Sequence, residues 1–246
     1  MAHSHDEWPD AGMPAEAIVQ WALDTFHPHI AIASSFSMED VALIDMAVHR
    51  NPSVRIFALD TGRLNEETYE IAEAVCRRFG IRVEWHFPRR EAVERLEREK
   101  GLLSFRESIA ARHECCEIRK VEPLSRALLG LKAWITGIRR EQSVTRVAVR
   151  PVEEDEAHGG IIKVNPLADW TTGEVGAYVR ARDLPVNRLY TQGYTSIGCA
   201  PCTRAVEAGE HPRAGRWWWE LPEHKECGLH ARPVKHRGAT GEGSRH

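Results

Sequence analysis

The sequence contains no long hydrophobic run: no apolar stretch approaches the ~20 residues that a membrane-spanning helix needs. Residues 1–8 lack the basic and apolar regions of a signal peptide. The formal net charge is only -3, so no excess of one sign indicates binding to nucleic acid or to a membrane surface. These absences predict a cytoplasmic protein that binds neither nucleic acid nor a membrane. In the cytoplasm, thiols are kept reduced.

Internal repeats are also absent, and low-complexity sequence is confined to the tail over residues 238–246. Of the 246 residues, 42% are hydrophobic and 28% are charged, which is typical of a globular protein with one substantial core. We therefore expect a flexible N-terminus over residues 1–13, one α/β domain over 14–219, and a mobile C-terminal segment over 220–246.

Short apolar runs typical of strands alternate with helical patterns along most of the chain. This alternation predicts a parallel sheet with helices on both faces. The region after residue 190 is rich in Gly, Pro, Cys and Trp and is expected to be irregular. Expected strands cover residues 29–33, 54–59, 81–86 and 132–136, and expected helices cover 14–23, 39–44, 66–79, 91–99, 117–129 and a stretch beyond 171.

Three of the predicted strands end in residues that suit a nucleotide. The first strand leads into a helix through a loop with Ser35 and Ser37, where hydroxyls and backbone N–H groups can cradle a phosphate. An ordinary serine N-cap explains this loop equally well. The second strand ends at Leu59, and the third is followed by Gly137 and Arg139. Because ligands bind at the carboxyl ends of parallel strands, the three ends together favour a nucleotide site.

Four of the six cysteines form two pairs, Cys115-Cys116 and Cys199-x-x-Cys202. Four thiolates are the usual ligands of a 4Fe-4S cluster and also suit zinc. An adjacent pair is awkward for zinc, whose ligand pairs usually stand two to four residues apart, so the cluster is favoured. Cys76, inside a predicted helix, is expected to be a small core residue.

The sixth cysteine, Cys227, stands in a charged, glycine-containing stretch near the C-terminus. Such a cysteine is exposed enough to react, and Lys225 and His230 nearby would favour its thiolate. A free surface cysteine with no role is the alternative. Three arginines after the second cysteine pair suit phosphate or sulfate oxygens, namely Arg204, Arg213 and Arg216.

Taken together and in this order, the motifs resemble the adenylyl-sulfate reductase branch of the APS/PAPS reductase family. The most specific are the two cysteine pairs and Glu226-Cys227-Gly228-Leu229-His230. Supporting motifs are Ser35-x-Ser37, the segment from Leu59 to Gly62, and the segment from Thr136 to Arg140. The family's serine loop often carries a glycine, which is absent around Met38 here.

The resemblance implies an adenine nucleotide α-hydrolase-like (Rossmann-like) fold, with a 4Fe-4S cluster on Cys115, Cys116, Cys199 and Cys202. Lys120 matches the family lysine between cluster and substrate, and Arg213 and Arg216 match the arginines that hold the phosphosulfate. The substrate-binding residues implied in this way are Ser35, Ser37, Leu59, Lys120, Gly137, Arg139, Arg213, Arg216 and His230.

The implied activity is reduction of adenylyl-sulfate (APS) to sulfite and AMP in sulfate assimilation, which feeds cysteine biosynthesis. Cys227 would form an S-sulfocysteine intermediate, which a thioredoxin or glutaredoxin-type reductant would reduce, and a homo-oligomer is possible. Three alternatives stand beside this hypothesis. A reductase of PAPS usually lacks the cluster cysteines, a tRNA thiolase normally carries a Ser-Gly-Gly-x-Asp-Ser loop, and a zinc-stabilised nucleotide-binding module would need no Cys227.

Overall fold

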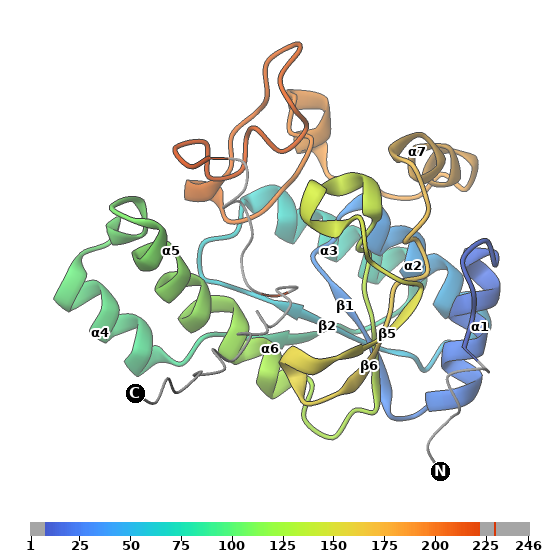
Figure 1. Ribbon diagram of the computed structural model, residues 1–246. Coiled ribbons are helices and arrows are strands. Elements are labelled where there is room, and N and C mark those ends of the chain that lie inside the picture. The colour runs from blue at the N-terminus through green and yellow to red at the C-terminus, as the bar shows by residue number, and fades with distance from the viewer. Residues whose placement is uncertain (1–7, 222–228, 230–246) are drawn as a thin grey trace, which may run out of the picture.

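The computed structural model describes residues 8–221 and 229, and it is built around one six-stranded sheet (Figure 1). The strand order is β3-β2-β1-β4-β6-β5. All neighbouring strands are parallel except β5 and β6, which form an antiparallel pair at one edge. The strands are β1 (Ile30–Ser34), β2 (Arg55–Leu59), β3 (Glu84–His86), β4 (Ala133–Ile135), β5 (Val152–Asp155) and β6 (Ile161–Val164).

Helices connect the parallel strands and extend beyond the sheet. After the first cysteine pair, a π-helical turn over Glu117–Val121 joins the helix over residues 109–116 to the helix over residues 122–127, so the three form one continuous helical segment. After residue 185 only short 3₁₀ turns occur within the described residues, at Arg188–Gln192 and Ala200–Cys202. The helices are α1 (Ala15–Phe26), α2 (Met38–Arg50), α3 (Glu66–Phe79), α4 (Arg90–Lys100), α5 (Ile109–Cys116), α6 (Glu122–Ala127) and α7 (Thr172–Ala181).

The two faces of the sheet pack against different helices because successive side chains of a strand point to opposite sides. Ile30 and Ile32 of β1 face the main core, which α1, α2, α3 and α7 cover. Ala31 between them faces the other side, where it packs with Trp134 and with Leu124 of α6. Helices therefore cover both faces, as the alternation of elements predicts (Figure 1).

The predicted parallel sheet is confirmed, and the antiparallel pair β5–β6 extends it at one edge. Predicted strands over residues 29–33, 54–59, 81–86 and 132–136 are confirmed, although the third is reduced to Glu84–His86. The β5–β6 hairpin was not predicted. Its first strand reads Val152-Glu153-Glu154-Asp155, and a run with three acidic residues resembles a loop more than a strand.

The helix expected over residues 117–129 begins earlier than predicted. Residues 109–116 are already helical, so Cys115 and Cys116 lie in the last turn of α5 and not before a helix. Trp8, within the N-terminal stretch, packs against the main core. Among the described residues, no helix has the length and apolar character needed to cross a bilayer.

Candidate active site

The chain changes direction around β1, and this places the candidate nucleotide site. β1 pairs with β2 on one side and β4 on the other, so the connections leave toward opposite halves of the sheet. In open α/β sheets, ligands bind outside the carboxyl ends of the strands at such a switch point. Ser34 ends β1 and Gly137 follows β4, so the serine loop and the glycine lie on this edge.

The serine loop is a helix N-cap with an unusual backbone. The Ser37 side chain accepts a hydrogen bond from the Asp40 N–H, and α2 starts with a complete capping box. Phe36 is buried and has a φ of 58°, in the left-handed region that glycine adopts most easily. A buried phenylalanine therefore stands in a backbone conformation that suits glycine. Holding it there costs roughly 1–3 kcal/mol, which the buried ring and the hydrogen bonds of the loop offset.

Asp40 organises this loop. Its Oδ2 atom accepts hydrogen bonds from the Ser35 N–H at 2.6 Å, the Ser35 hydroxyl at 2.8 Å and the Ser37 N–H at 3.4 Å. Burial raises the pKa of Asp40 to about 6; the hydrogen bonds from Ser35 and Ser37 oppose the shift, and the neighbouring charge of Glu39 adds to it. The loop is therefore shaped by a carboxyl group whose charge is costly in the folded state.

Asp40→Asn is expected to change how stability depends on pH. The folded pKa lies above the unfolded value of 3.8, so the folded state binds more protons between pH ~4 and ~6, and wild-type stability falls as pH rises through that window. About two pKa units correspond to about 3 kcal/mol. Urea unfolding should show the variant gaining up to that amount over wild type by pH 7, with the gap closing toward pH 4. The control is Asp24→Asn, which removes an exposed carboxylate paired with Arg50, and a gap independent of pH would contradict this expectation.

A cavity of about 420 Å³ opens at the switch point. Its size is that of a small-molecule site, and polar groups from the strand ends lie among apolar side chains such as Phe57 and Leu124. Eight of the nine predicted substrate-binding residues line it, although they come from segments far apart in the sequence. They are Ser35, Ser37, Leu59, Lys120, Gly137, Arg139, Arg213 and Arg216.

Two of these residues are held by protein partners. The guanidinium of Arg139 is buried, and it donates to Glu39 at 2.9 Å and to Glu141 at 2.8 Å. Arg216 packs over Gly198, where an added Cβ would lie 2.4 Å from its Nη2 atom. Arg204, which the sequence also offers as an anion ligand, does not line the cavity and instead pairs with Glu210 through two hydrogen bonds.

Gly137→Ala is expected to damage the nucleotide site. A Cβ at this position would lie 2.5 Å from Oδ1 of Asp40 and 2.9 Å from Cβ of Glu39, so the serine loop must move. Overpacking of this kind costs typically 1–3 kcal/mol, and AMP affinity should fall about tenfold, as measured by calorimetry. The matched control is Gly173→Ala in α7, where the nearest atom would be Thr171 Oγ1 at 3.7 Å. Equal AMP affinity of both variants and wild type would contradict the expectation.

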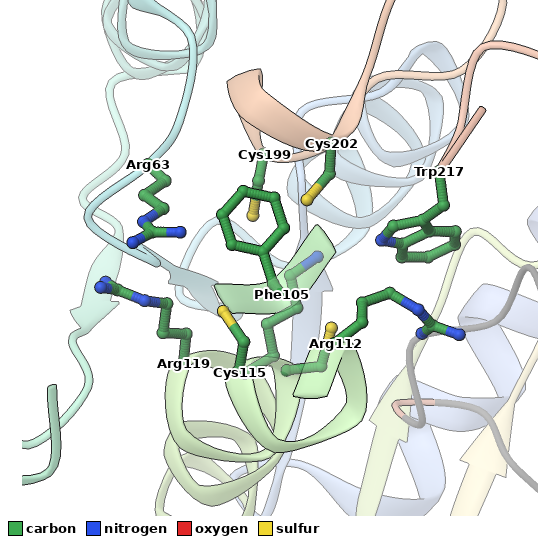
Figure 2. A pocket seen from close by; sticks show the side chains of 10 residues that line it. Arg63, Phe105, Arg112, Cys115, Arg119, Cys199, Cys202 and Trp217 are labelled. Carbon is green, nitrogen blue, oxygen red and sulfur yellow. The ribbon is translucent and has the colours of Figure 1, made fainter. Parts of the chain in front are cut away.

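The four paired cysteines line a second, smaller cavity together. Cys199 and Cys202 point from the 3₁₀ turn toward Cys115, which points from the end of α5 (Figure 2). Cys116 lines the same cavity, and all four side chains are buried. Phe105 and Trp217 complete an apolar cluster around the sulfur atoms. Two motifs more than eighty positions apart are therefore brought to one place.

Basic side chains surround this cysteine cavity. Arg63 and Arg119 lie in its wall, and Glu97 accepts a hydrogen bond from each, at 3.0 and 2.5 Å. Arg119 also donates to the Thr61 carbonyl at 2.7 Å. The π-helical turn places Arg119 and Lys120 beside the cysteines of α5, and π-helical turns occur often at functional sites.

The thiols differ in their readiness to ionise. Burial disfavours the thiolate of Cys199, but the charges of Lys120, Arg216 and Arg119 and a 3.3 Å hydrogen bond with Thr61 outweigh it, so the pKa of this thiol is lowered. Burial, followed by the charge of Cys199, raises the pKa of Cys202 to about 12, and burial raises that of Cys115. Four thiolates in this space therefore require further positive charge, as a metal centre provides.

The chemistry of the donor set fits an iron–sulfur cluster. Four thiols line one cavity with four cationic side chains, Arg63, Arg112, Arg119 and Lys120, that suit an anionic cluster. Nε of Arg119 and Nε1 of Trp217 are buried without a hydrogen-bond partner among the described residues, and both could donate to sulfur. Within residues 8–221 and 229, no group of three or more His, Cys, Asp or Glu side chains is arranged to hold a single metal ion.

The two cavities share a wall. Three residues line both cavities, namely Lys120, Cys199 and Trp217. Arg216 lines the nucleotide cavity, and its guanidinium stacks on Trp217 at 4.6 Å from the ring centroid. A charge in the cysteine cavity therefore acts on the nucleotide cavity across single side chains. This arrangement links the cysteine pairs to the chemistry of the bound nucleotide.

Several residues of the site escape sequence reasoning. Charged residues on helices are normally exposed, so nothing in the sequence marks Arg112 and Arg119 as buried around the cysteines, or the half-buried Glu97 as a partner of Arg119. Cys76 was predicted to be a core residue, but it is only half-buried on α3. Cys227 and His230 lie outside the described residues; Leu229, two positions after Cys227, lines the nucleotide cavity.

The fold and these two cavities define a nucleotide-binding α/β protein with a cysteine centre beside the nucleotide site. The sequence model of the phosphoadenosine phosphosulfate reductase domain matches residues 29–205, and the chain belongs to this family. Its fold is adenine nucleotide α-hydrolase-like.

Similar proteins in other organisms carry related names. The chain is 50% identical to an adenosine 5'-phosphosulfate reductase of Burkholderia cepacia, covering 88% of this chain and 86% of that protein. It is 51% identical to an adenosine 5'-phosphosulfate reductase of Allochromatium vinosum, covering 82% of this chain and 79% of that protein. A crystal structure of phosphoadenylyl-sulfate (PAPS) reductase from Candida auris, in complex with phosphate, matches with a TM-score of 0.67 at 27% identity, covering 79% of this chain and 91% of that one.

Proposed function

We propose that this protein reduces adenylyl-sulfate to sulfite and AMP, with Cys227 as the nucleophile and a thioredoxin-type dithiol as the reductant. The observation that carries the proposal is the wall shared by the nucleotide cavity and the four-cysteine cavity, with Lys120 in both linings. Family membership and about 50% identity to proteins named adenosine 5'-phosphosulfate reductase support it. In the cell, the reaction would supply sulfite for cysteine biosynthesis in the cytoplasm.

The residues of the nucleotide cavity suit the two ends of this substrate. The cavity between the serine loop and Gly137 has room for adenosine, with apolar walls at Phe57 and Leu124. Lys120, Arg213 and Arg216 line the same cavity and provide cations for the phosphosulfate oxygens. Cations placed where negative charge develops stabilise a transition state more than a ground state.

The first step is a nucleophilic displacement at sulfur. The Cys227 thiolate attacks the sulfur atom of adenylyl-sulfate and forms an S–S bond. The bond between that sulfur and the bridging oxygen breaks, and its electron pair leaves with AMP. The enzyme then carries an S-sulfocysteine, and the cations of the cavity balance the charge that gathers on the departing phosphate.

The second step releases sulfite by thiol exchange. A thiolate of the reductant attacks Sγ of the S-sulfocysteine, and sulfite leaves with the electron pair of the S–S bond. The second thiol of the reductant resolves the mixed disulfide and returns Cys227 to the thiolate. The reductant thus supplies both electrons and becomes a disulfide.

Cys115, Cys116, Cys199 and Cys202 would hold a 4Fe-4S cluster beside the substrate. When bound, such a cluster supplies a fixed anionic centre that orders this part of the chain. Lys120, which lines both cavities, would carry its electrostatic influence to the phosphosulfate. Electron delivery by the cluster is not part of this proposal.

The test is an anaerobic assay of sulfite release with thioredoxin, giving APS and PAPS in parallel. We expect strong preference for APS. Preference for PAPS would keep the fold and the nucleophile but contradict the proposed substrate. Activity with neither substrate, from protein of full iron content, would overturn the proposed function and direct attention to ATP-dependent tRNA thiolation.

A further inference from the structure

Arg112 and Glu220 form a buried ion pair that the reaction as described leaves without a role. Arg112 stands on α5, three positions before Cys115, and its side chain is 1% exposed. Its Nε donates to Oε1 of Glu220 at 2.7 Å and its Nη2 donates to Oε2 at 2.9 Å. The Glu220 side chain is 3% exposed, so both charges are withdrawn from water and satisfy each other in bidentate geometry.

Trp217 ties this pair to both cavities. The guanidinium groups of Arg112 and Arg216 each lie 4.6 Å from the centroid of its ring. The backbone N–H of Trp217 donates to the Cys202 carbonyl at 3.0 Å, and the backbone N–H of Glu220 donates to the Trp217 carbonyl at 2.8 Å. Trp217 has a φ of 39°, a strained conformation for a non-glycine residue that persists only where its surroundings fix it. The turn over residues 217–220 is thus held from several sides.

Separating the two side chains would cost each buried charge its bidentate hydrogen bonds, so the pair opposes any departure of Glu220 from α5. Glu220 precedes Cys227 by seven positions. Since a chain advances at most ~3.6 Å per residue, a fixed Glu220 keeps the Cys227 thiol within about 25 Å of it. Confinement to such a volume gives an effective thiol concentration on the order of 10 mM, which falls if the root of the segment comes loose.

We propose that Arg112 and Glu220 are positioning residues. They fix residue 220, which precedes the Cys227-bearing segment, to α5, the helix that carries Cys115 and Cys116 beside the nucleotide cavity. This inference rests on the proposed function, because it assigns the pair a task in delivering the nucleophile. The pair acts on the rate at which Cys227 meets bound substrate and not on the binding of the nucleotide.

The experiment compares Glu220→Gln with wild type in the full-length, anaerobically purified protein. The rate constant for AMP release from APS is measured in a single turnover without reductant, together with AMP affinity and iron content. We expect the rate constant to fall about threefold, because the tether to Cys227 lengthens from seven residues to the ten that follow Trp217, while AMP affinity and iron content stay at wild-type values. The matched control is Glu210→Gln, which breaks an equally bidentate pair with Arg204 that is about one-third exposed.

An unchanged rate constant in Glu220→Gln would overturn the inference. So would a loss of iron and of AMP affinity in proportion to the rate, because the pair would then only support the cysteine cavity. If Glu220→Gln does not fold, Glu220→Asp keeps the charge with a shorter reach, and its rate constant should fall by up to about threefold; a wild-type rate would overturn the inference. Failure of the wild-type protein to release AMP from APS would instead refute the proposed function.

Discussion

Replacing Cys227 by serine is expected to abolish sulfite formation from APS, lowering turnover by roughly a thousandfold or more. A serine hydroxyl is almost fully protonated at neutral pH and no general base is assigned to it, whereas a cysteine is a strong nucleophile through its thiolate. Iron content and AMP affinity should be unchanged, because other side chains are proposed as the cluster ligands and as the cations and serines of the nucleotide cavity. Sulfite release with thioredoxin measures the effect.

Cys76→Ser is the matched control for this experiment. Cys76 is half-buried on α3 and lines neither cavity. Burial, with the charge of Glu73, raises its pKa, so it is a poorer nucleophile than an ordinary thiol. This variant should turn over at the wild-type rate. Retained turnover in Cys227→Ser, or equal losses in both variants, would contradict the role given to Cys227.

Cys199→Ser is expected to remove both the iron–sulfur centre and the activity. Burial disfavours the thiolate of Cys199, but Lys120, Thr61 and the nearby arginines outweigh it and lower the pKa of this thiol, whereas the pKa values of Cys115 and Cys202 are raised. It also lines both cavities, so its loss reaches the substrate directly. We expect the visible absorbance of the anaerobically purified variant and its iron content to fall at least fivefold, and turnover to fall about a hundredfold.

The same measurements on Cys76→Ser separate a specific effect from general damage to cysteine content. Wild-type iron content in Cys199→Ser would mean that this thiol is not a ligand. Zinc at one equivalent in the wild-type protein, with no iron, would contradict the cluster outright and favour a structural metal site.

Short apolar runs were sufficient to predict the parallel part of the sheet. Residues 30–32 and 56–58 are buried on both faces, and a strand of this kind needs a continuous run of apolar residues. β5 is the edge strand of the sheet, and an edge strand can carry charged residues. Glu153 and Glu154 therefore give β5 the composition of a loop, and the hairpin is not recognised from the sequence. Edge strands are therefore the part of this fold that periodicity misses.

In the candidate site too, some residues can be predicted from local sequence and others cannot. Ser35, Gly137 and the cysteine pairs carry local signals, because a loop after a strand or a pair of thiols needs particular residues at particular spacings. The side chains around them do not. Arg112 meets Glu220 across 108 positions of sequence, and only the folded chain reveals that the two charges neutralise each other out of water.

In the serine loop, side-chain contacts hold a backbone conformation that glycine adopts most easily. Where glycine would relieve strain, Phe36 is held at a φ of 58° by its burial and by a 3.1 Å hydrogen bond from its N–H to Ser34 Oγ. Asp40 then gathers the donors of Ser35 and Ser37. The loop keeps its place at the carboxyl end of β1 through side-chain contacts, which a comparison of motifs does not register.

The most direct test of the account is to mix anaerobically purified protein with APS, without reductant, and to follow AMP release and the mass of the protein. The proposed mechanism requires one AMP per active site and the addition of one SO₃ group on Cys227, and thioredoxin should then remove this group as sulfite. AMP release without an adduct on Cys227, or an adduct on any other residue, would contradict the mechanism.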